Sequence, residues 1–192
     1  MELAEKNIGY ALTGSFCTFS ISIKEIKKLI QAGANVFPIM SYHSYKLDTK
    51  FGKAQDFIEK IEEITGNKII HTIPDAEPIG PKKMFDILVV APCSGNTIAK
   101  LANDIIDTPA TMAVKSHLRN CRPVVIGIST NNALSGAAEN IGKLLNRKHY
   151  YFVPFKQDNP ITKPRSIVCD FSYLQKTLEY ALEGKQISPI IL

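Results

Sequence analysis

The chain has 192 residues, a length that suits one domain with a substantial core, and 45% of them are hydrophobic and 21% charged. Its formal net charge of +5 comes from scattered lysines and arginines. The sequence has no basic stripe with interleaved aromatic residues, so we expect no nucleic-acid interface. No apolar run approaches the roughly 20 residues of a membrane-spanning helix, so the composition predicts a soluble globular protein without membrane contact.

The N-terminal segment and the cysteine spacing both indicate a cytoplasmic protein. Residues 1–6 carry acids and lead directly into a predicted strand, unlike a secretory signal. The four cysteines form no Cys-x-x-Cys pair and have no zinc-ligand spacing with histidine, so we expect reduced thiols and no metal site. Cys17, Cys121 and Cys169 are expected to pack as small apolar side chains, whereas Cys93 lies beside a candidate ligand loop.

Apolar runs and helical periodicity alternate along the whole chain. Strands are predicted at 7–13, 35–40, 68–72, 87–90, 123–128 and 150–154. Helices are predicted at 15–31, in the segment that ends at Gly66, at 94–103, from 107 onward, at 135–146 and at 171–183. Polar loops are predicted at 41–50 and 157–165, and an irregular proline-rich segment at 74–81. The apolar tail at 187–192 is expected to pack on the core, with an interface element as the alternative.

This alternation predicts an α/β fold of three layers. Most of the strands are nearly continuous apolar runs, which is typical of a parallel sheet covered by helices on both faces. We therefore expect a six-stranded parallel sheet in a single domain over 1–192, with the strand at 87–90 buried at its centre. Ligands of such sheets bind at the carboxyl ends of the strands, beside the point where the strand order reverses.

The most informative motif is the end of that central strand. The apolar run from Asp86 stops at Pro92, and the small polar residues of 94–97 follow where the next helix begins. Free backbone N–H groups and the helix dipole favour a phosphate there. Gly14 and Ser15 occupy the same position after the first strand, so the two loops together predict a cradle for one phosphate.

The alternative is that these polar residues only cap helices. One cap needs one such residue, so the run Ser94–Thr97 favours a ligand, whereas for Ser15 both interpretations stay open. The chain lacks a Gly-x-Gly-x-x-Gly fingerprint and a Gly-x-x-x-x-Gly-Lys-Ser/Thr loop, which disfavours dinucleotide and ATP binding. The histidines have no triad or metal spacing, and His43, in the loop after the second strand, is the best placed of them.

The run Ala91–Ile105 resembles the Ala-Pro-x-Ser-Ala-Asn-Thr-x-x-Lys-x-Ala signature of the FMN-binding flavoproteins, a family that includes cysteine decarboxylases and flavin prenyltransferases. Further segments make the whole chain most similar to the dipicolinate synthase B subunits within that family. These segments are 11–19, 107–113, 131–135, 150–155 and 157–160. The resemblance implies a Rossmann-like fold with bound FMN. The residues that it assigns to FMN are Gly14, Ser15, Ser41, Ser94, Gly95, Asn96 and Thr97.

The resemblance also implies a function and a partner. Together with an A subunit that holds NADP, the chain would oxidise a dihydrodipicolinate-type precursor to dipicolinate in the mother cell of a sporulating bacterium, as part of an oligomer. The alternatives are a non-catalytic scaffold subunit with a degenerate flavin site, or a stand-alone FMN-dependent decarboxylase or prenyltransferase. No catalytic residue is assigned.

Two departures from the family argue against decarboxylation. Decarboxylases carry a histidine shortly before the signature strand, where this chain has Glu77–Gly80, and their Pro-x-Met-Asn segment is replaced by Thr130–Ala133. The expected small dicarboxylate substrate needs cationic partners. The candidates follow the last predicted strand and are Lys156, Lys163 and Arg165.

Overall fold

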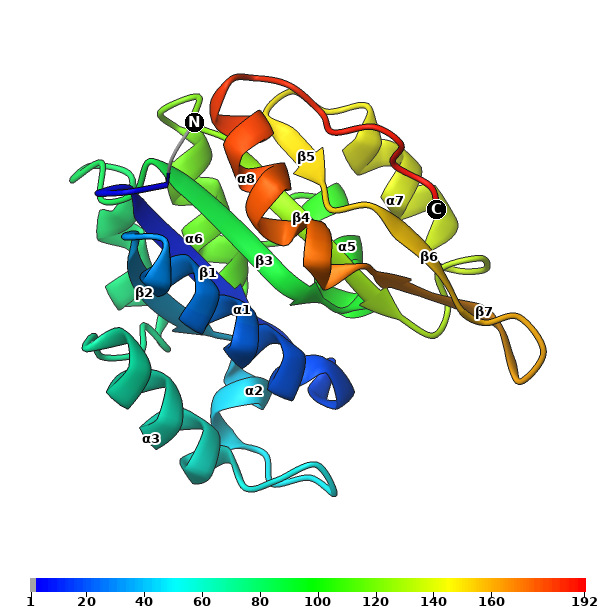
Figure 1. Cartoon of the computed structure of the whole chain (residues 1–192), viewed down its shortest axis with the longest axis horizontal. Helices are drawn as coiled ribbons and strands as arrows, with labels where there is room; N and C mark the ends of the chain where they lie inside the picture. Colours follow the sequence, from blue (N-terminus) through cyan, green and yellow to red (C-terminus); the bar gives the residue numbers. More distant parts are fainter. Residues whose placement is uncertain (1–2) are drawn as a thin grey trace.

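Five parallel strands form the centre of the fold in a computed structural model that describes residues 3–192 (Figure 1). In spatial order they are β2 (Asn35–Met40), β1 (Asn7–Leu12), β3 (Ile87–Cys93), β4 (Val124–Thr130) and β5 (Tyr150–Phe152). Every residue of β3 is buried, which confirms its predicted central position. Apolar side chains on both faces of these strands explain why the sheet is covered on both sides.

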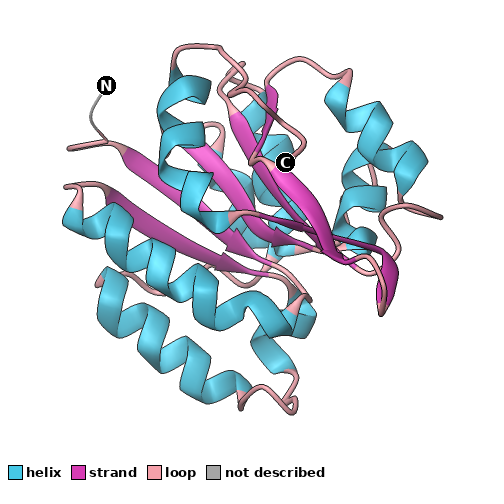
Figure 2. Cartoon of the chain, turned by 45° about the vertical axis from the view of Figure 1, so that its right-hand side comes forward, coloured by secondary structure: helices cyan, strands magenta, loops and turns pink. Residues whose placement is uncertain are grey.

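Helices form the two outer layers. On one face, α1 (Phe19–Gln31) and α8 (Leu174–Leu182) contact each other and the central strands, and α3 (Ala54–Thr65) packs beside α1. On the other face, α5 (Gly95–Ala102) contacts both α6 (Pro109–Leu118) and α7 (Ala138–Leu145). Figure 2 shows this layering, and the predicted three-layer α/β class is confirmed.

The sheet differs from the prediction beyond the end of β4, where two antiparallel strands are added. Residues 157–165 were expected to form a loop, but β6 (Phe155–Asn159) and β7 (Lys163–Cys169) form an antiparallel hairpin that projects from the sheet (Figure 1). β7 pairs antiparallel with the end of β4, whereas β5 pairs with its beginning. The sheet is therefore mostly parallel rather than six parallel strands. Both strands of the hairpin carry polar residues on both faces, so they lack the apolar alternation by which strands are predicted from a sequence.

Other differences lie in short segments. Residues 68–72 contribute a single bridge, Ile39 to Ile70, instead of a strand. The proline-rich segment is helical over α4 (Ile73–Ala76) and the 3₁₀ turn η2 (Glu77–Ile79), because proline suits the first turn of a helix. The expected loop 41–50 contains α2 (Tyr42–Lys46). Two further 3₁₀ turns, η1 (Phe16–Thr18) and η3 (Phe171–Tyr173), precede α1 and α8.

The apolar tail packs on the core only in part. Ile187 is buried, but Ile191 is 69% exposed and bridges the outer edge of β6 at Phe155. No helix within residues 3–192 has the length and apolar character needed to cross a bilayer. Met1 and Glu2, which entered the argument on secretion, lie outside the described residues.

Candidate functional site

The site opens where the strand order reverses, between β1 and β3. Thr13, directly after β1, fixes the two strand ends to each other. Its Oγ1 donates to the Pro92 carbonyl at 2.8 Å and accepts from the Ser94 N–H at 2.9 Å. Sequence reasoning missed this buried hydroxyl, although a threonine that ends an apolar run is a visible signal.

A cavity of about 880 Å³ lies at this edge, a size suited to a small-molecule ligand. Its walls come from the loops after β1, β3 and β4, from the loop between α2 and α3, and from the hairpin. The lining residues are Gly14, Ser15, Phe16, Cys17, Thr18, Ile21, Lys50, Phe51, Ser94, Gly95, Asn96, Ser129, Thr130, Asn131, Asn132, Asp158, Lys163, Ser166, Ile167 and Val168. This larger cavity is thus lined by both polar and apolar side chains.

A smaller cavity of about 500 Å³ adjoins it. Gly14, Phe16, Ser94 and Asn96 line both spaces. The remaining lining residues of the smaller cavity are Ser41, Tyr42, His43, Leu47, Thr97, Lys100, Asp107 and Thr108. Each of the seven residues predicted to hold FMN therefore lines one or both cavities, while their role in FMN binding stays a prediction.

The serines of this set have different structural roles. Ser94 caps α5, accepting from the Thr97 N–H at 3.4 Å, and Ser41 caps α2. Ser15 was considered as a helix cap, but its hydroxyl donates to the Ser129 carbonyl at 2.8 Å instead. This bond joins the loop after β1 to the end of β4, so Ser15 closes one wall of the larger cavity.

Asn96 leaves a hydrogen-bond donor, and Gly14 leaves room, for a ligand. The exposed Asn96 side chain makes no hydrogen bond to another described residue, so its amide is available in both cavities. A Cβ at Gly14 would meet no atom within 4 Å, which places open space beside this residue. A Cβ at Gly95 would lie 2.6 Å from both Thr130 Oγ1 and Asn132 Oδ1, so these two side chains at the end of β4 occupy the space beside Gly95.

The exposure of the cysteines differs from the prediction, except at Cys169. Cys93 is fully buried and lines neither cavity, so its thiol does not face a ligand in either one; burial also raises the pKa of this thiol far above its usual range. Cys17 and Cys121 are exposed rather than packed, and Cys17 lines the larger cavity; Cys169 is buried as expected. Among the described residues, no three acidic, histidine or cysteine side chains meet in a way that would hold a metal ion.

Each of the two cavities is lined by one lysine–aspartate ion pair. In the larger one, Lys163 Nζ lies 2.6 Å from Asp158 Oδ2, and this carboxylate raises the pKa of Lys163. In the smaller one, Lys100 Nζ lies 2.8 Å from Asp107 Oδ1. Of the three basic residues proposed for a dicarboxylate, Lys163 is in the described lining, and Lys156 and Arg165 are outside it.

Comparison with known proteins decides the family. A model of the flavoprotein family matches residues 1–173, most of the chain. The chain belongs to the flavoprotein family. This confirms the resemblance that the signature at 91–105 indicated.

Two relatives within the flavoproteins match nearly the whole chain. The dipicolinate synthase B subunit of Bacillus subtilis (strain 168) is 43% identical over 190 residues, which cover 99% of this chain and 95% of that protein. The crystal structure of the dipicolinate synthase B subunit from Bacillus halodurans C has a TM-score of 0.92 and 43% identity, and covers 100% of this chain and 98% of that one. The more specific resemblance to these proteins is thus confirmed.

A more distant neighbour shares the fold. Burkholderia xenovorans DmrB, solved in complex with FMN, has a TM-score of 0.69 at 16% identity, with 93% of this chain and 96% of that chain covered. At this identity the likeness shows the common architecture of the flavoproteins alone.

Proposed function

We propose that this chain is the flavin-binding B subunit of a dipicolinate synthase. The observation that carries the proposal is its similarity, over 99% of its length, to a protein of that name. Family membership supports an enzyme-related role and flavin binding. In the finer form of the proposal, NADP is held by a partner A subunit, and the pair oxidises a dihydrodipicolinate-type precursor in the cytoplasm of a sporulating mother cell.

The described residues fit FMN. A flat isoalloxazine ring needs apolar surface, and Phe16, Ile21 and Phe51 supply it in the larger cavity. The ribityl chain and phosphate need hydrogen-bond donors, which the amide of Asn96 and the hydroxyls of the strand-end loops provide. The residues that would hold the cofactor are Gly14, Ser15, Ser41, Ser94, Gly95, Asn96 and Thr97. FMN bound there supplies a two-electron redox centre.

The chain's own residues would bind and orient the reactants. Oxidation of a dihydropyridine dicarboxylate removes two hydrogen atoms, and the NADP of the partner accepts the electrons in this proposal. The titratable side chains among the described residues of the larger cavity are Cys17, Lys50, Asp158 and Lys163. Asp158 is engaged by Lys163, so no residue is assigned as general base.

A second candidate is a scaffold subunit with a degenerate flavin site. One observation favours it, because the hydroxyls of Ser94 and Ser41, two predicted FMN ligands, already form helix caps. A stand-alone decarboxylase is disfavoured, since Glu77–Gly80 stands where decarboxylases carry their histidine. Gly80 in that segment packs directly against Ser116 of α6, which gives the segment a structural role.

Reconstitution tests the proposed function. The purified chain, its partner, dihydrodipicolinate, FMN and NADP are mixed, and dipicolinate is followed by its absorbance while one component at a time is omitted. We expect formation of dipicolinate to require this chain and FMN. Full activity of the partner in the absence of this chain would refute a catalytic role, and activity that needs this chain but not FMN would favour the scaffold.

A further inference from the structure

Few charged residues line the larger cavity, and more of them are cations than anions. Among its described residues, Lys50 and Lys163 are the cations and Asp158 is the single anion, with no arginine. The remaining polar lining consists of amides, hydroxyls and one thiol, which are neutral donors and acceptors. The cavity therefore carries an excess positive charge, which favours an anionic ligand.

The ion pair between Lys163 and Asp158 can be exchanged at little cost. Both residues belong to the hairpin, five positions apart, and their side chains are 58% and 35% exposed. Solvent-exposed ion pairs contribute little net stability, because water and salt screen them. A ligand carboxylate that reaches Lys163 can thus replace Asp158 without loss of a strong interaction.

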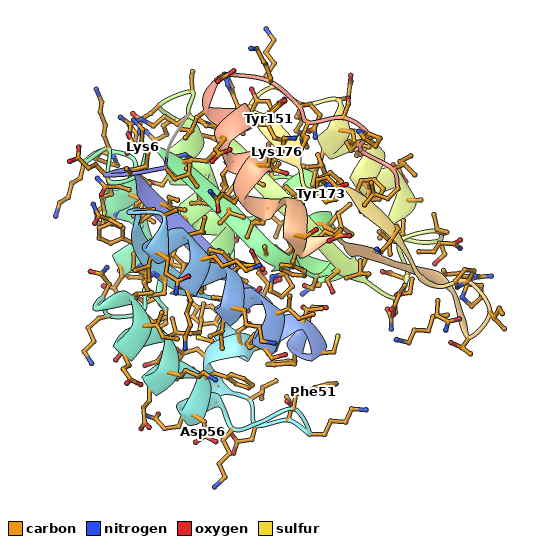
Figure 3. All side chains as sticks on the ribbon, in the orientation of Figure 1. Lys6, Phe51, Asp56, Tyr151, Tyr173 and Lys176 are labelled. Atoms are coloured by element: carbon orange, nitrogen blue, oxygen red, sulfur yellow. The ribbon has the colours of Figure 1, made fainter. Side chains whose placement is uncertain are left out.

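Lys50 has no such competitor. It lies in the loop between α2 and α3, and no carboxylate within residues 3–192 pairs with it. Its Nζ lies 5.3 Å from the centre of the Phe51 ring, a residue that also lines the cavity and is labelled on this loop in Figure 3. A cation held over an aromatic face stays available to an anion.

We propose, building on the proposed function, that Lys50 and Lys163 recognise the two carboxylates of a flat pyridine dicarboxylate in the larger cavity, and that Asp158 competes with the ligand for Lys163. A ligand with two carboxylates can give each lysine its own anionic partner, whereas a ligand with one carboxylate offers a single anionic group to the two cations. The amides of Asn131 and Asn132 provide neutral hydrogen bonds in the same lining. This arrangement selects dianions over monoanions.

Calorimetric titration of the full chain with dipicolinate tests the proposal. We expect Lys50→Gln and Lys163→Gln each to weaken binding by about tenfold or more, since a charge-assisted hydrogen bond is lost. Asp158→Asn is expected to strengthen binding severalfold, because it removes the competing charge. Lys156→Gln is the matched control: Lys156 lies outside the described lining and pairs with Asp170, so its loss should leave binding unchanged.

The test is decisive because Lys163→Gln and Asp158→Asn are expected to change the affinity for dipicolinate in opposite directions. A general disturbance of the hairpin would weaken binding in Asp158→Asn and Lys163→Gln alike, and that result would overturn the proposal. So would wild-type protein that fails to bind dipicolinate at millimolar concentration, or lysine variants that bind as wild type does. Picolinate, which has one carboxylate, should bind more weakly than dipicolinate, and equal affinities would also contradict the proposal.

A parallel FMN titration, followed by flavin fluorescence, separates this inference from the proposed function. Normal FMN affinity in Lys50→Gln and Lys163→Gln, together with weakened dipicolinate binding, supports both. FMN binding with no effect of the lysines on dipicolinate refutes the inference alone. Dipicolinate binding that depends on both lysines in a chain that binds no FMN refutes the flavin role and leaves the inference standing.

Discussion

Replacing Thr13 by valine tests the link between the strand ends at the site. Valine has nearly the shape of threonine, so Thr13→Val removes the hydroxyl and largely retains the packing of this fully buried position. The Pro92 carbonyl keeps a donor, because the Thr13 N–H lies 3.3 Å from it. The Ser94 N–H, by contrast, loses the Oγ1 acceptor that lies 2.9 Å away.

The expected loss follows from that one unsatisfied donor. A partly buried N–H without its partner costs about 1–3 kcal/mol, so we expect Thr13→Val to lower the free energy of unfolding by about 2 kcal/mol. For a chain of this length that corresponds to a fall in Tm of about 4–8 °C. Urea unfolding followed by circular dichroism gives the free energy, and a thermal scan gives the Tm.

Two control variants isolate the hydroxyl. Thr13→Ser keeps the donor and acceptor and should recover the Ser94 hydrogen bond. Thr162→Val changes an exposed threonine of the hairpin turn whose side chain bonds to no other described residue, and its effect should stay within about 0.5 kcal/mol. An unfolding curve of Thr13→Val that superimposes on that of wild type would refute the reasoning.

Three further predictions concern other residues. Burial lowers the pKa of His117 from 6.5 to about 4, so the unfolded chain binds more protons than the folded chain between these pH values. The free energy of unfolding should therefore fall by about 3 kcal/mol as the pH drops from 6.5 to 4. In His117→Gln, urea midpoints measured over this range should lack this contribution to the pH dependence. Gly95→Ala should destabilise the fold by about 1 kcal/mol, because its Cβ displaces the hydrogen-bonded side chains of Thr130 and Asn132, whereas Gly14→Ala should stay within about 0.5 kcal/mol of wild type; equal unfolding midpoints would contradict this. A thiol reagent should modify Cys17 and Cys121 in the native protein, and reaction of all four cysteines before unfolding would disprove the assigned burial of Cys93 and Cys169.

The sequence by itself determined the parts of this protein that depend on neighbouring residues. Strand and helix alternation, the buried run at 87–90 and the start of a helix at Ser94 are local patterns, set by side-chain periodicity and by the hydrogen bonds of a helix end. The Ala91–Ile105 signature likewise indicated the flavoprotein family that the comparisons confirm. A parallel sheet then brings the strand-end loops to one edge, so the seven candidate FMN residues line neighbouring cavities.

The tertiary structure decided what depends on strand order and long-range pairing. Ser15 bonds to Ser129, 114 residues away, and not to its own helix, because β1 and β4 end at the same edge of the sheet. The hairpin at 155–169 exists because β7 pairs with the end of β4, a contact that compensates for its polar and weakly patterned residues. Lys50 and Lys163 line one cavity only after that hairpin is in place. No local pattern encodes such contacts, since a side chain's partner across the sheet is set by how distant strands pair.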